Sequence, residues 1–247
     1  MIIFAVETST LLGGLAILDD VSGLLAEIRL NVKSTHSERL MTETDHILKQ
    51  TGLAVSDIDV FAISIGPGSF TGLRIGLSTV KGFSFATGKP IVSVPTLEAL
   101  AWHFTYSGYP VCTMFDARKK EVYAALFRWV KDGFVKLIDE VSIRVDLFLE
   151  NIITGNPPSP HFNKGANAGF SDDKIIFTGE GSLLYKKDII SVMGERAIFA
   201  SPEKMIPSPA NVAFLGMKKA LNGDFSEPLS LVPVYIRRSE AEIKRDV

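Results

Sequence analysis

The sequence predicts an α/β protein with two similar lobes. An apolar run from Val60 to Ile65 ends at Gly66-Pro67-Gly68 and is followed by a segment with helical spacing, which is the order strand, tight loop, helix. A strand, polar turn, strand, turn, strand order begins both halves of the chain. With 247 residues, of which 46% are hydrophobic and 22% charged, the chain is long enough for one large or two modest globular cores.

The first half contains the elements of one complete lobe, for which we expect residues 1–108. Turn signals separate three short apolar runs, which predicts an antiparallel meander. A helix then presents Leu40, Met41, Ile47 and Leu48 on one face. The predicted strands are 2–6, 14–18, 24–30, 60–65 and 90–94, and the predicted helices are 37–51, the segment after Gly68, and one that begins at Pro95 and Thr96.

The second half, residues 109–247, is expected to form the second lobe. Its last helix begins at Ser208 and Pro209 and ends at Gly223. Packing of this helix on the first lobe stays open as an alternative. The predicted strands are 111–115, 121–130, 134–143 and 175–178; 156–167 is expected to be a surface loop, 208–222 a helix, and 237–245 a solvated charged tail.

Composition excludes several classes of protein. A net charge of −2 gives no general attraction to nucleic acid or to anionic membranes, so any nucleic-acid contact must come through a local patch or a partner. The single cysteine, Cys112, lies in an apolar run and is predicted to be a buried thiol, which fits a reducing compartment. We expect no signal peptide, no membrane segment and a cytoplasmic protein.

The Gly66-Pro67-Gly68 loop has two interpretations. It is either a phosphate-binding loop at a helix N-terminus or a rigid elbow that positions a helix. The spacing fits neither a P-loop nor a dinucleotide-binding fingerprint, and no lysine follows the glycines. The elbow is therefore favoured.

The helix after this loop is small or apolar around most of its circumference. Gly72 and Gly76 lie four residues apart, and Thr79 and Phe83 continue the same stripe. Two glycines inside a helix cost roughly 1 kcal/mol each relative to alanine, so a close packing contact is expected to offset them. Approach of another helix and burial against the lobe's own sheet both stay open as that contact.

No convincing catalytic set is present. The sequence contains no H-x-x-x-H, C-x-x-C, H-E-x-x-H or G-x-S-x-G pattern, which disfavours a metal site and a serine hydrolase. Asp116 and Arg118 fit either a charged-ligand site or a simple ion pair. Glu7, with the hydroxyls at 8–10, fits either a phosphate cradle or a hydrogen-bonded hairpin.

Six motifs occur in an order that closely resembles the bacterial TsaB family, also called YeaZ, over the whole chain. GPGSFTGLR is the most specific of them. The motifs are AVETST (5–10), HSE (36–38), IGPGSFTGLRIG (65–76), PTLEAL (95–100), DARKKEVY (116–123) and PVYIR (233–237).

This resemblance implies an actin-like ATPase (ribonuclease-H-like) fold with two similar lobes, each with a mixed sheet flanked by helices. It also implies a part in making N6-threonylcarbamoyladenosine beside the anticodon of tRNA, as partner of the transferase TsaD and, in a larger complex, the ATPase TsaE. The family pairs through its first lobe, as a homodimer alone or with TsaD, and tRNA is expected to be reached only indirectly. The implied interface residues are Leu40, Met41, Leu48, Gly72, Leu73, Gly76, Thr79 and Phe83.

The same resemblance implies that this chain is not itself a catalyst. Where TsaD carries a metal-binding H-x-x-x-H, this chain has Thr96 and Leu100, so no metal is expected. Glu7 stands where the family usually has aspartate, and long basic side chains fill the turn that holds phosphate in actin-like kinases. No cofactor is expected, although weak ATP or ADP binding stays open. The residues of such a vestigial nucleotide site are Glu7, Thr8, Ser9, Thr10, Asp116, Arg118, Gly179 and Gly181.

Three functions are candidates for this chain. The leading hypothesis is a non-catalytic scaffold that binds TsaD. The alternative is an independent actin-like nucleotide-binding ATPase or kinase-like enzyme, supported by the hydroxyls at 8–10 and the glycines at 179 and 181. A metallopeptidase ranks last because the sequence supplies no ligand set for a metal.

Overall fold

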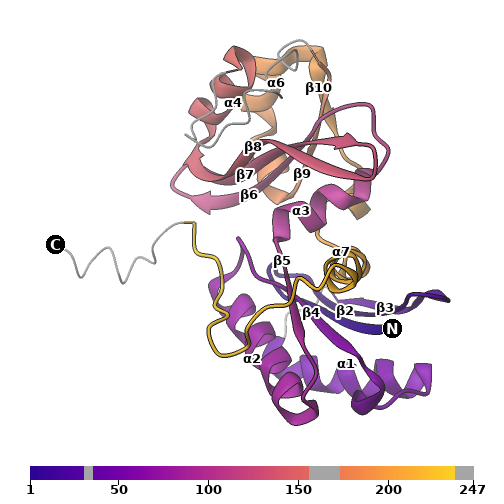
Figure 1. Ribbon diagram of the computed structural model, residues 1–247. Coiled ribbons are helices and arrows are strands. Elements are labelled where there is room, and N and C mark those ends of the chain that lie inside the picture. The colour runs from indigo at the N-terminus through magenta and orange to yellow at the C-terminus, as the bar shows by residue number, and fades with distance from the viewer. Residues whose placement is uncertain (31–35, 156–172, 237–247) are drawn as a thin grey trace. The chain divides into compact units, whose positions relative to one another are not determined.

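The computed structural model describes residues 1–30, 36–155 and 173–236, and the chain divides into two compact units (Figure 1). Unit 1 comprises Met1–Ala99 and Pro207–Val234. Unit 2 comprises the described residues of Leu100–Ile206 together with Tyr235 and Ile236. The boundary differs from the expected one at 108, because residues 100–108 group with unit 2. The helix expected at 208–222 takes the alternative placement and packs on the first lobe, and residues 207–234 as a whole group with unit 1. The predicted loop at 156–167 and the charged tail at 237–245 lie outside the described residues.

Unit 1 is built on a five-stranded mixed sheet in the order β3-β2-β1-β4-β5. The first three strands are antiparallel neighbours, whereas β4 and β5 run parallel to β1. The central strands are apolar on both faces, since helices cover both, and every residue of β4 is buried. The strands are β1 (Ile2–Glu7), β2 (Gly13–Asp19), β3 (Gly23–Leu30), β4 (Val60–Ser64) and β5 (Ile91–Val94).

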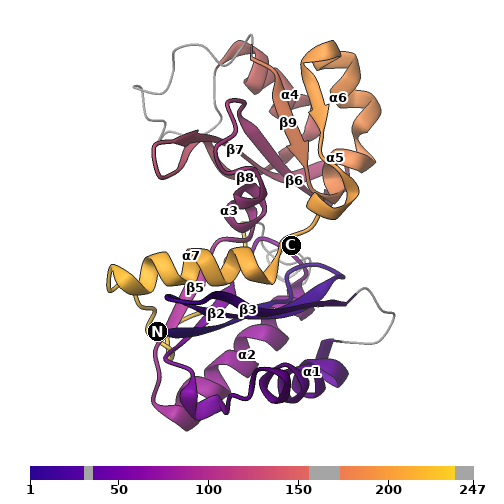
Figure 2. The same cartoon turned by 90° about the vertical axis from the view of Figure 1, so that its right-hand side faces the viewer.

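Helices pack on both faces of this sheet (Figure 2). On one face, α1 (His36–Thr51) packs on β2 and β3, and α2 (Phe70–Thr87) packs on β4. On the other face, α7 (Pro209–Leu221) crosses β1, β2, β4 and β5. A short 3₁₀ turn, η1 (Val55–Asp57), connects α1 to β4, and α3 (Thr96–Ala101) begins in unit 1.

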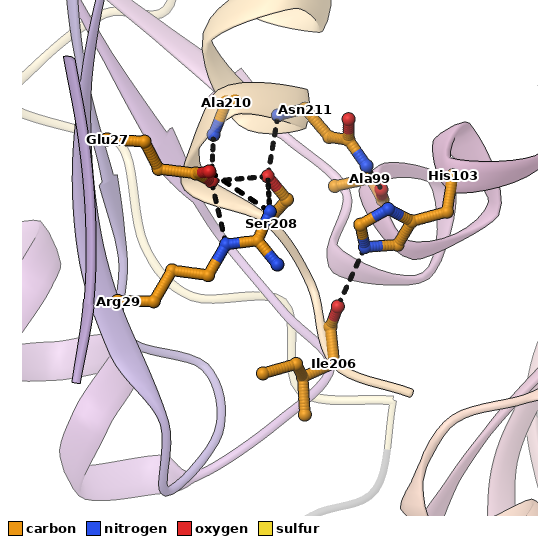
Figure 3. Close-up of polar contacts among 8 residues, drawn as sticks. All are labelled: Glu27, Arg29, Ala99, His103, Ile206, Ser208, Ala210 and Asn211. Atoms are coloured by element: carbon orange, nitrogen blue, oxygen red, sulfur yellow. Dashed lines mark hydrogen bonds and ion pairs between the residues drawn. The ribbon is translucent and has the colours of Figure 1, made fainter. Parts of the chain in front are cut away.

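Polar contacts attach the start of α7 to β3, although about 180 residues separate them in sequence (Figure 3). Ser208 caps the helix by accepting a hydrogen bond from the Asn211 N–H. The Glu27 carboxylate accepts from Ser208 Oγ (2.5 Å) and Ala210 N–H (3.1 Å), and Arg29 Nε donates to it (2.9 Å). An acidic group is therefore held at the positive end of a helix.

Unit 2 repeats the plan of unit 1. Its sheet has the order β10-β9-β6-β7-β8, in which β6, β7 and β8 are antiparallel neighbours and β9 and β10 run parallel to β6. The elements are β6 (Val111–Arg118), β7 (Glu121–Val130), β8 (Gly133–Arg144), α4 (Val145–Thr154), β9 (Ile175–Thr178), α5 (Glu180–Leu184), α6 (Lys186–Met193) and β10 (Ala197–Phe199), with 3₁₀ turns η2 (Trp102–Phe104), η4 (Gly194–Arg196) and η5 (Pro202–Lys204).

Each sheet thus has three antiparallel strands followed by two parallel ones, in the same spatial order. This confirms the predicted fold class of two similar actin-like lobes, each with a mixed sheet and flanking helices. Cys112 is buried, as predicted, and burial raises the pKa of its thiol far above the ordinary range. The helices α4, α5 and α6 and the strand β10 are elements that the sequence analysis did not predict.

Across residues 1–30, 36–155 and 173–236, none of the helices combines the length and the apolar character needed to span a membrane.

Replacing Glu27 by Gln is expected to lower the free energy of unfolding by about 1–3 kcal/mol, because a charged acceptor for three donors is lost. Burial raises the pKa of Glu27, but the hydrogen bonds from Arg29, Ser208 and Ala210 outweigh it and hold the pKa below the usual value. The stabilisation is therefore present above about pH 4.3, the ordinary glutamate pKa, and is lost as the pH falls through the lowered pKa.

Chemical denaturation between acidic and neutral pH measures this effect. Asp45→Asn is the matched control, since Asp45 forms an exposed pair with Lys49 on α1 and should change stability by at most about 0.5 kcal/mol. A Glu27→Gln variant with wild-type stability over the whole range would contradict the assignment.

Candidate functional site

The loop between β4 and α2 is closed by contacts within unit 1. The Gly66 N–H donates to Thr96 Oγ1 (3.1 Å), and the Ser69 N–H donates to the Ser9 carbonyl (2.6 Å). Ser69 caps α2 by accepting from the Gly72 N–H (3.2 Å). The N–H groups of Gly66, Ser69 and Gly72, which a phosphate at this helix start would compete for, have protein acceptors. The geometry therefore favours the elbow over the phosphate loop.

Two glycines bring α2 against the segment after β1. A Cβ at Gly68 would overlap the Ser9 carbonyl oxygen and lie 2.8 Å from Ser9 Cβ. A Cβ at Gly76 would overlap Thr8 Oγ1 and lie 3.0 Å from Ile63 Cδ1. Glycine is needed at position 76 because Thr8, directly after β1, and Ile63 of β4 lie against it. The prediction that Gly76 makes room for a helix of another protein is therefore corrected. Helical spacing alone could not distinguish these two contacts.

Most of the residues predicted for the docking interface belong to the core of unit 1. Phe83, half-buried, stacks on Phe61 with ring centroids 5.6 Å apart, and Thr79 is also half-buried. Met41, at 55% exposed, lies on the surface. The buried members are Leu40, Leu48, Gly72, Leu73 and Gly76.

The solvent-facing side of α1 and α2 is a different set of residues. Phe85 is 92% exposed, and the Arg74 guanidinium lies 3.8 Å from the centroid of the Phe70 ring. Gly82 has nothing within 4 Å of a built Cβ, in contrast to Gly76. We call Met41, Phe70, Arg74, Ser78, Gly82 and Phe85 the outer helix face.

Glu7 ends β1 and is buried among hydroxyl groups. Its Oε1 accepts from the Ser9 N–H (2.6 Å) and from Ser9 Oγ, and its Oε2 accepts from Ser64 Oγ. Thr10 Oγ1 donates to the Leu12 carbonyl (2.7 Å), and Thr8 Oγ1 is buried with no hydrogen-bond partner in the described part of the chain. Glu7 and Ser9 thus bond to each other, and Ser64 and the Leu12 carbonyl bond to Glu7 and Thr10, respectively, contacts of the kind expected for the hairpin interpretation.

The turn after β6 carries the predicted second-lobe residues. Asp116 Oδ1 accepts from the Arg118 N–H (3.0 Å) and from the Tyr185 hydroxyl (3.3 Å). The Arg118 side chain is 88% exposed, with Nε 3.9 Å from Asp116 Oδ2. Arg118, Lys119 and Lys120 all have positive φ, a conformation unusual for side chains of this size. The ion-pair interpretation of Asp116 and Arg118 matches this geometry.

Gly179 and Gly181 lie directly on the backbone of β6. A Cβ at Gly179 would overlap the Met114 carbonyl oxygen, and one at Gly181 would lie 2.9 Å from the Phe115 carbonyl carbon. Between them, Glu180 is exposed, and its pKa is raised, first by partial desolvation of its carboxylate and then by the negative charge of Asp116. These glycines are thus explained by packing on β6. The two predicted nucleotide sets lie in different units, Glu7–Thr10 in unit 1 and the rest in unit 2.

The side chains at the two positions of the metal-binding motif are buried. Thr96 accepts the hydrogen bond from Gly66, and Leu100 offers no ligand atom. Among the residues that the structure describes, no group of three His, Cys, Asp or Glu side chains is arranged to hold a metal ion.

Sequence reasoning missed the Glu27–Ser208 network, Thr96 as an acceptor, and an aromatic cluster around Trp129 in unit 2. A local signal existed for one of them, since Ser208-Pro209 is a helix start whose cap and N–H groups need partners.

The chain is similar in sequence and in fold to known proteins. The sequence matches the family described as "TsaD: tRNA N6-adenosine threonylcarbamoyltransferase" over residues 23–245. The tRNA threonylcarbamoyladenosine biosynthesis protein TsaB of Bacillus subtilis is 28% identical over 244 residues, 99% of this chain and 97% of the relative. The protein of the same name from Escherichia coli is 32% identical over 136 residues, 54% of this chain and 58% of the relative.

Among solved structures, YeaZ from Pseudomonas aeruginosa aligns with a TM-score of 0.73 at 23% identity and covers 95% of this chain and 99% of its own. That likeness concerns the fold.

The contact of Gly76 with Thr8 gives a direct prediction. Gly76→Ala is expected to destabilise unit 1 by about 1–3 kcal/mol, because the new methyl group overlaps Thr8 Oγ1 in a packed interior. Gly82→Ala, the matched control on the same helix, should stabilise by up to about 1 kcal/mol, since nothing lies near its Cβ.

Denaturant unfolding of the single variants and of the Thr8→Ala/Gly76→Ala double variant tests the cause. Removing Thr8 Oγ1 should recover part of the loss, and strictly additive effects would refute the contact.

Proposed function

We propose that this chain, which belongs to the family of the tRNA N6-adenosine threonylcarbamoyltransferase TsaD, is a non-catalytic subunit that binds a TsaD-type transferase. It would support threonylcarbamoyl transfer to the adenosine beside the anticodon of tRNA. Relatives named TsaB, one of them similar over nearly the full length, support a role in tRNA threonylcarbamoyladenosine biosynthesis.

The observation that carries the non-catalytic part of the proposal is the donor chemistry at Thr96 and Leu100. One is a buried hydroxyl engaged with the Gly66 N–H, and the other is a buried alkyl group. Neither supplies the imidazole nitrogen that the transferase motif would use, so the chain contributes structure to the reaction and the partner contributes the chemistry.

The docking surface that we propose is the outer helix face of α1 and α2. The interior stripe of Gly72 and Gly76 is occupied by the sheet of the same unit, whereas Met41 and Phe85 expose large apolar side chains. Exposed methionine and aromatic side chains are typical anchors of protein interfaces, as is arginine, which Arg74 supplies against the Phe70 ring. We propose that the same face serves a homodimer when TsaD is absent, that TsaE joins a larger complex, and that these assemblies act in the cytoplasm.

A TsaD pull-down measures docking on this face. Met41→Asp is expected to weaken the complex at least about tenfold, because a charge would be buried at the contact, while the fold tolerates it since Met41 is exposed. Leu147→Asp, on an exposed position of α4 in unit 2, is the control and should bind normally.

Formation of threonylcarbamoyladenosine on tRNA, assayed with TsaD in the presence and absence of the chain, gives the functional readout. If the Met41→Asp and Leu147→Asp variants bind TsaD equally well, the interface lies elsewhere. Full modification of tRNA without the chain would contradict the proposed role.

The competing enzyme proposal rests on nucleotide binding. We expect the isolated chain to bind Mg-ATP weakly or not at all, because Glu7 bonds to Ser9 and Ser64, and the glycines at 179 and 181 lie against β6. Calorimetric titration of the isolated chain with Mg-ATP decides the matter. Tight binding that Glu7→Ala abolishes would favour the nucleotide-binding enzyme instead.

A further inference from the structure

Unit 2 carries an aromatic cluster that no step of the proposed function uses. Residues 102–109, between α3 and β6, include five aromatic side chains and no carboxylate: Trp102, His103, Phe104, Tyr106 and Tyr109. Two strands bring further rings to the same place, because Trp129 of β7 and Phe134 of β8 are directly paired in register.

Trp129 lies at the centre of this cluster. Its ring centroid is 5.4 Å from that of Trp102, 5.0 Å from that of Tyr106 and 5.1 Å from that of Phe134. The interplanar angles of 55–83° show tilted or edge-to-face contacts. Trp102, Trp129 and Phe134 are half-buried, whereas Tyr106 is exposed. We call Trp102, Tyr106, Trp129 and Phe134 the aromatic platform.

Tyr106 has two properties that the folding of unit 2 does not explain. It is 83% exposed, and its φ of 64° lies in the left-handed region, which is costly for a bulky side chain. A residue held in a strained backbone conformation without the gain of burial is a candidate for binding. The strain fixes the exposed Tyr106 ring beside Trp129.

One lysine follows this platform in sequence, and another contacts Phe104 of the same 102–109 segment. Lys131 is exposed in the turn that follows Trp129, and Lys204 Nζ lies 5.2 Å from the centroid of the Phe104 ring. The Arg128 guanidinium is already paired with Asp173. An exposed aromatic ring with lysines near it is a combination that binds unpaired bases of RNA, in which the ring stacks on a base and the cations contact phosphate.

We propose that the aromatic platform binds single-stranded RNA by stacking an unpaired base on Tyr106. RNA is the occupant that fits, because the chain's relatives support a role in tRNA modification and because every base has a π-face that can stack on an exposed aromatic ring. This differs from the expectation that tRNA is reached only through a partner. The proposal does not depend on TsaD docking, since the platform lies in unit 2 and the outer helix face in unit 1.

Intrinsic fluorescence provides a specific probe, because the only two tryptophans of the chain, Trp102 and Trp129, both belong to the platform. An adenine-rich single-stranded RNA oligonucleotide should quench this fluorescence in the full-length chain. A fully paired RNA duplex of equal length should quench it far less, since its bases are not free to stack.

Variants of Tyr106 test the contact itself. Tyr106→Ala is expected to weaken binding of the oligonucleotide by about 5- to 150-fold, the usual effect of losing one base–aromatic stack. Tyr106→Phe, which keeps the ring, should bind like the wild type. Tyr109→Ala is the matched control, because Tyr109 is also exposed and the ring contacts of Trp129 described above are made by Trp102, Tyr106 and Phe134.

Tyr106→Gly separates binding from folding. Glycine adopts this φ freely, so the variant should be at least as stable as the wild type to denaturant, yet it should lose RNA binding as the alanine variant does.

Equal RNA affinity of the wild type and Tyr106→Ala would overturn the proposal, as would quenching by a proline-rich peptide but not by RNA. Met41→Asp should leave RNA binding unchanged, and Tyr106→Ala should leave TsaD binding unchanged. Failure of the docking proposal is therefore distinguishable from failure of this one.

Discussion

The close approach of α2 to the end of β1 is the constraint on which unit 1 depends. Gly68 and Gly76 let the elbow and the helix lie on Ser9 and Thr8, and the Ser69 N–H bonds to the Ser9 carbonyl at 2.6 Å. Any side chain at either glycine would separate α2 from the sheet. The same contact directs the hydroxyl-rich segment after β1 inward, where Glu7 becomes the acceptor for the hydroxyls of Ser9 and Ser64. Polar residues that could face a ligand are thereby used to join a helix to a sheet.

Unit 2 uses an equivalent arrangement at the corresponding strand-to-helix turn. In unit 1 the turn after β4 packs on the segment that ends β1, and in unit 2 the turn after β9 packs on β6 through Gly179 and Gly181. The strands concerned hold matching places in their sheets, since β4 neighbours β1 and β9 neighbours β6. Glycines in a strand-to-helix turn therefore have a sufficient explanation in packing. A ligand is not needed to account for them in either unit.

Local patterns were enough to predict the strands other than β10, the main helices of unit 1 and the capped start of α7. Alternation, Gly-Pro breaks and Ser-Pro caps depend on neighbouring residues, which a sequence displays directly. Contacts between distant residues were not predictable. Helical spacing shows that Gly76 shares a stripe with Gly72, but not that the stripe faces Thr8. Likewise, nothing near Glu27 or Trp102 indicates Ser208 or Trp129 as a partner.

The distribution of strain and exposure separates structural from functional features. At Gly66 and Gly179 positive φ occurs in glycine, which adopts it readily, and close backbone contacts account for both positions. Tyr106 has positive φ with a large exposed ring, and Phe85 and Met41 expose apolar area on helices whose other side is well packed. Folding does not bury these exposed side chains, whereas contact with another molecule would bury them. The parts of this chain best suited to act on others are therefore surfaces, one in each unit, and not its interior polar groups.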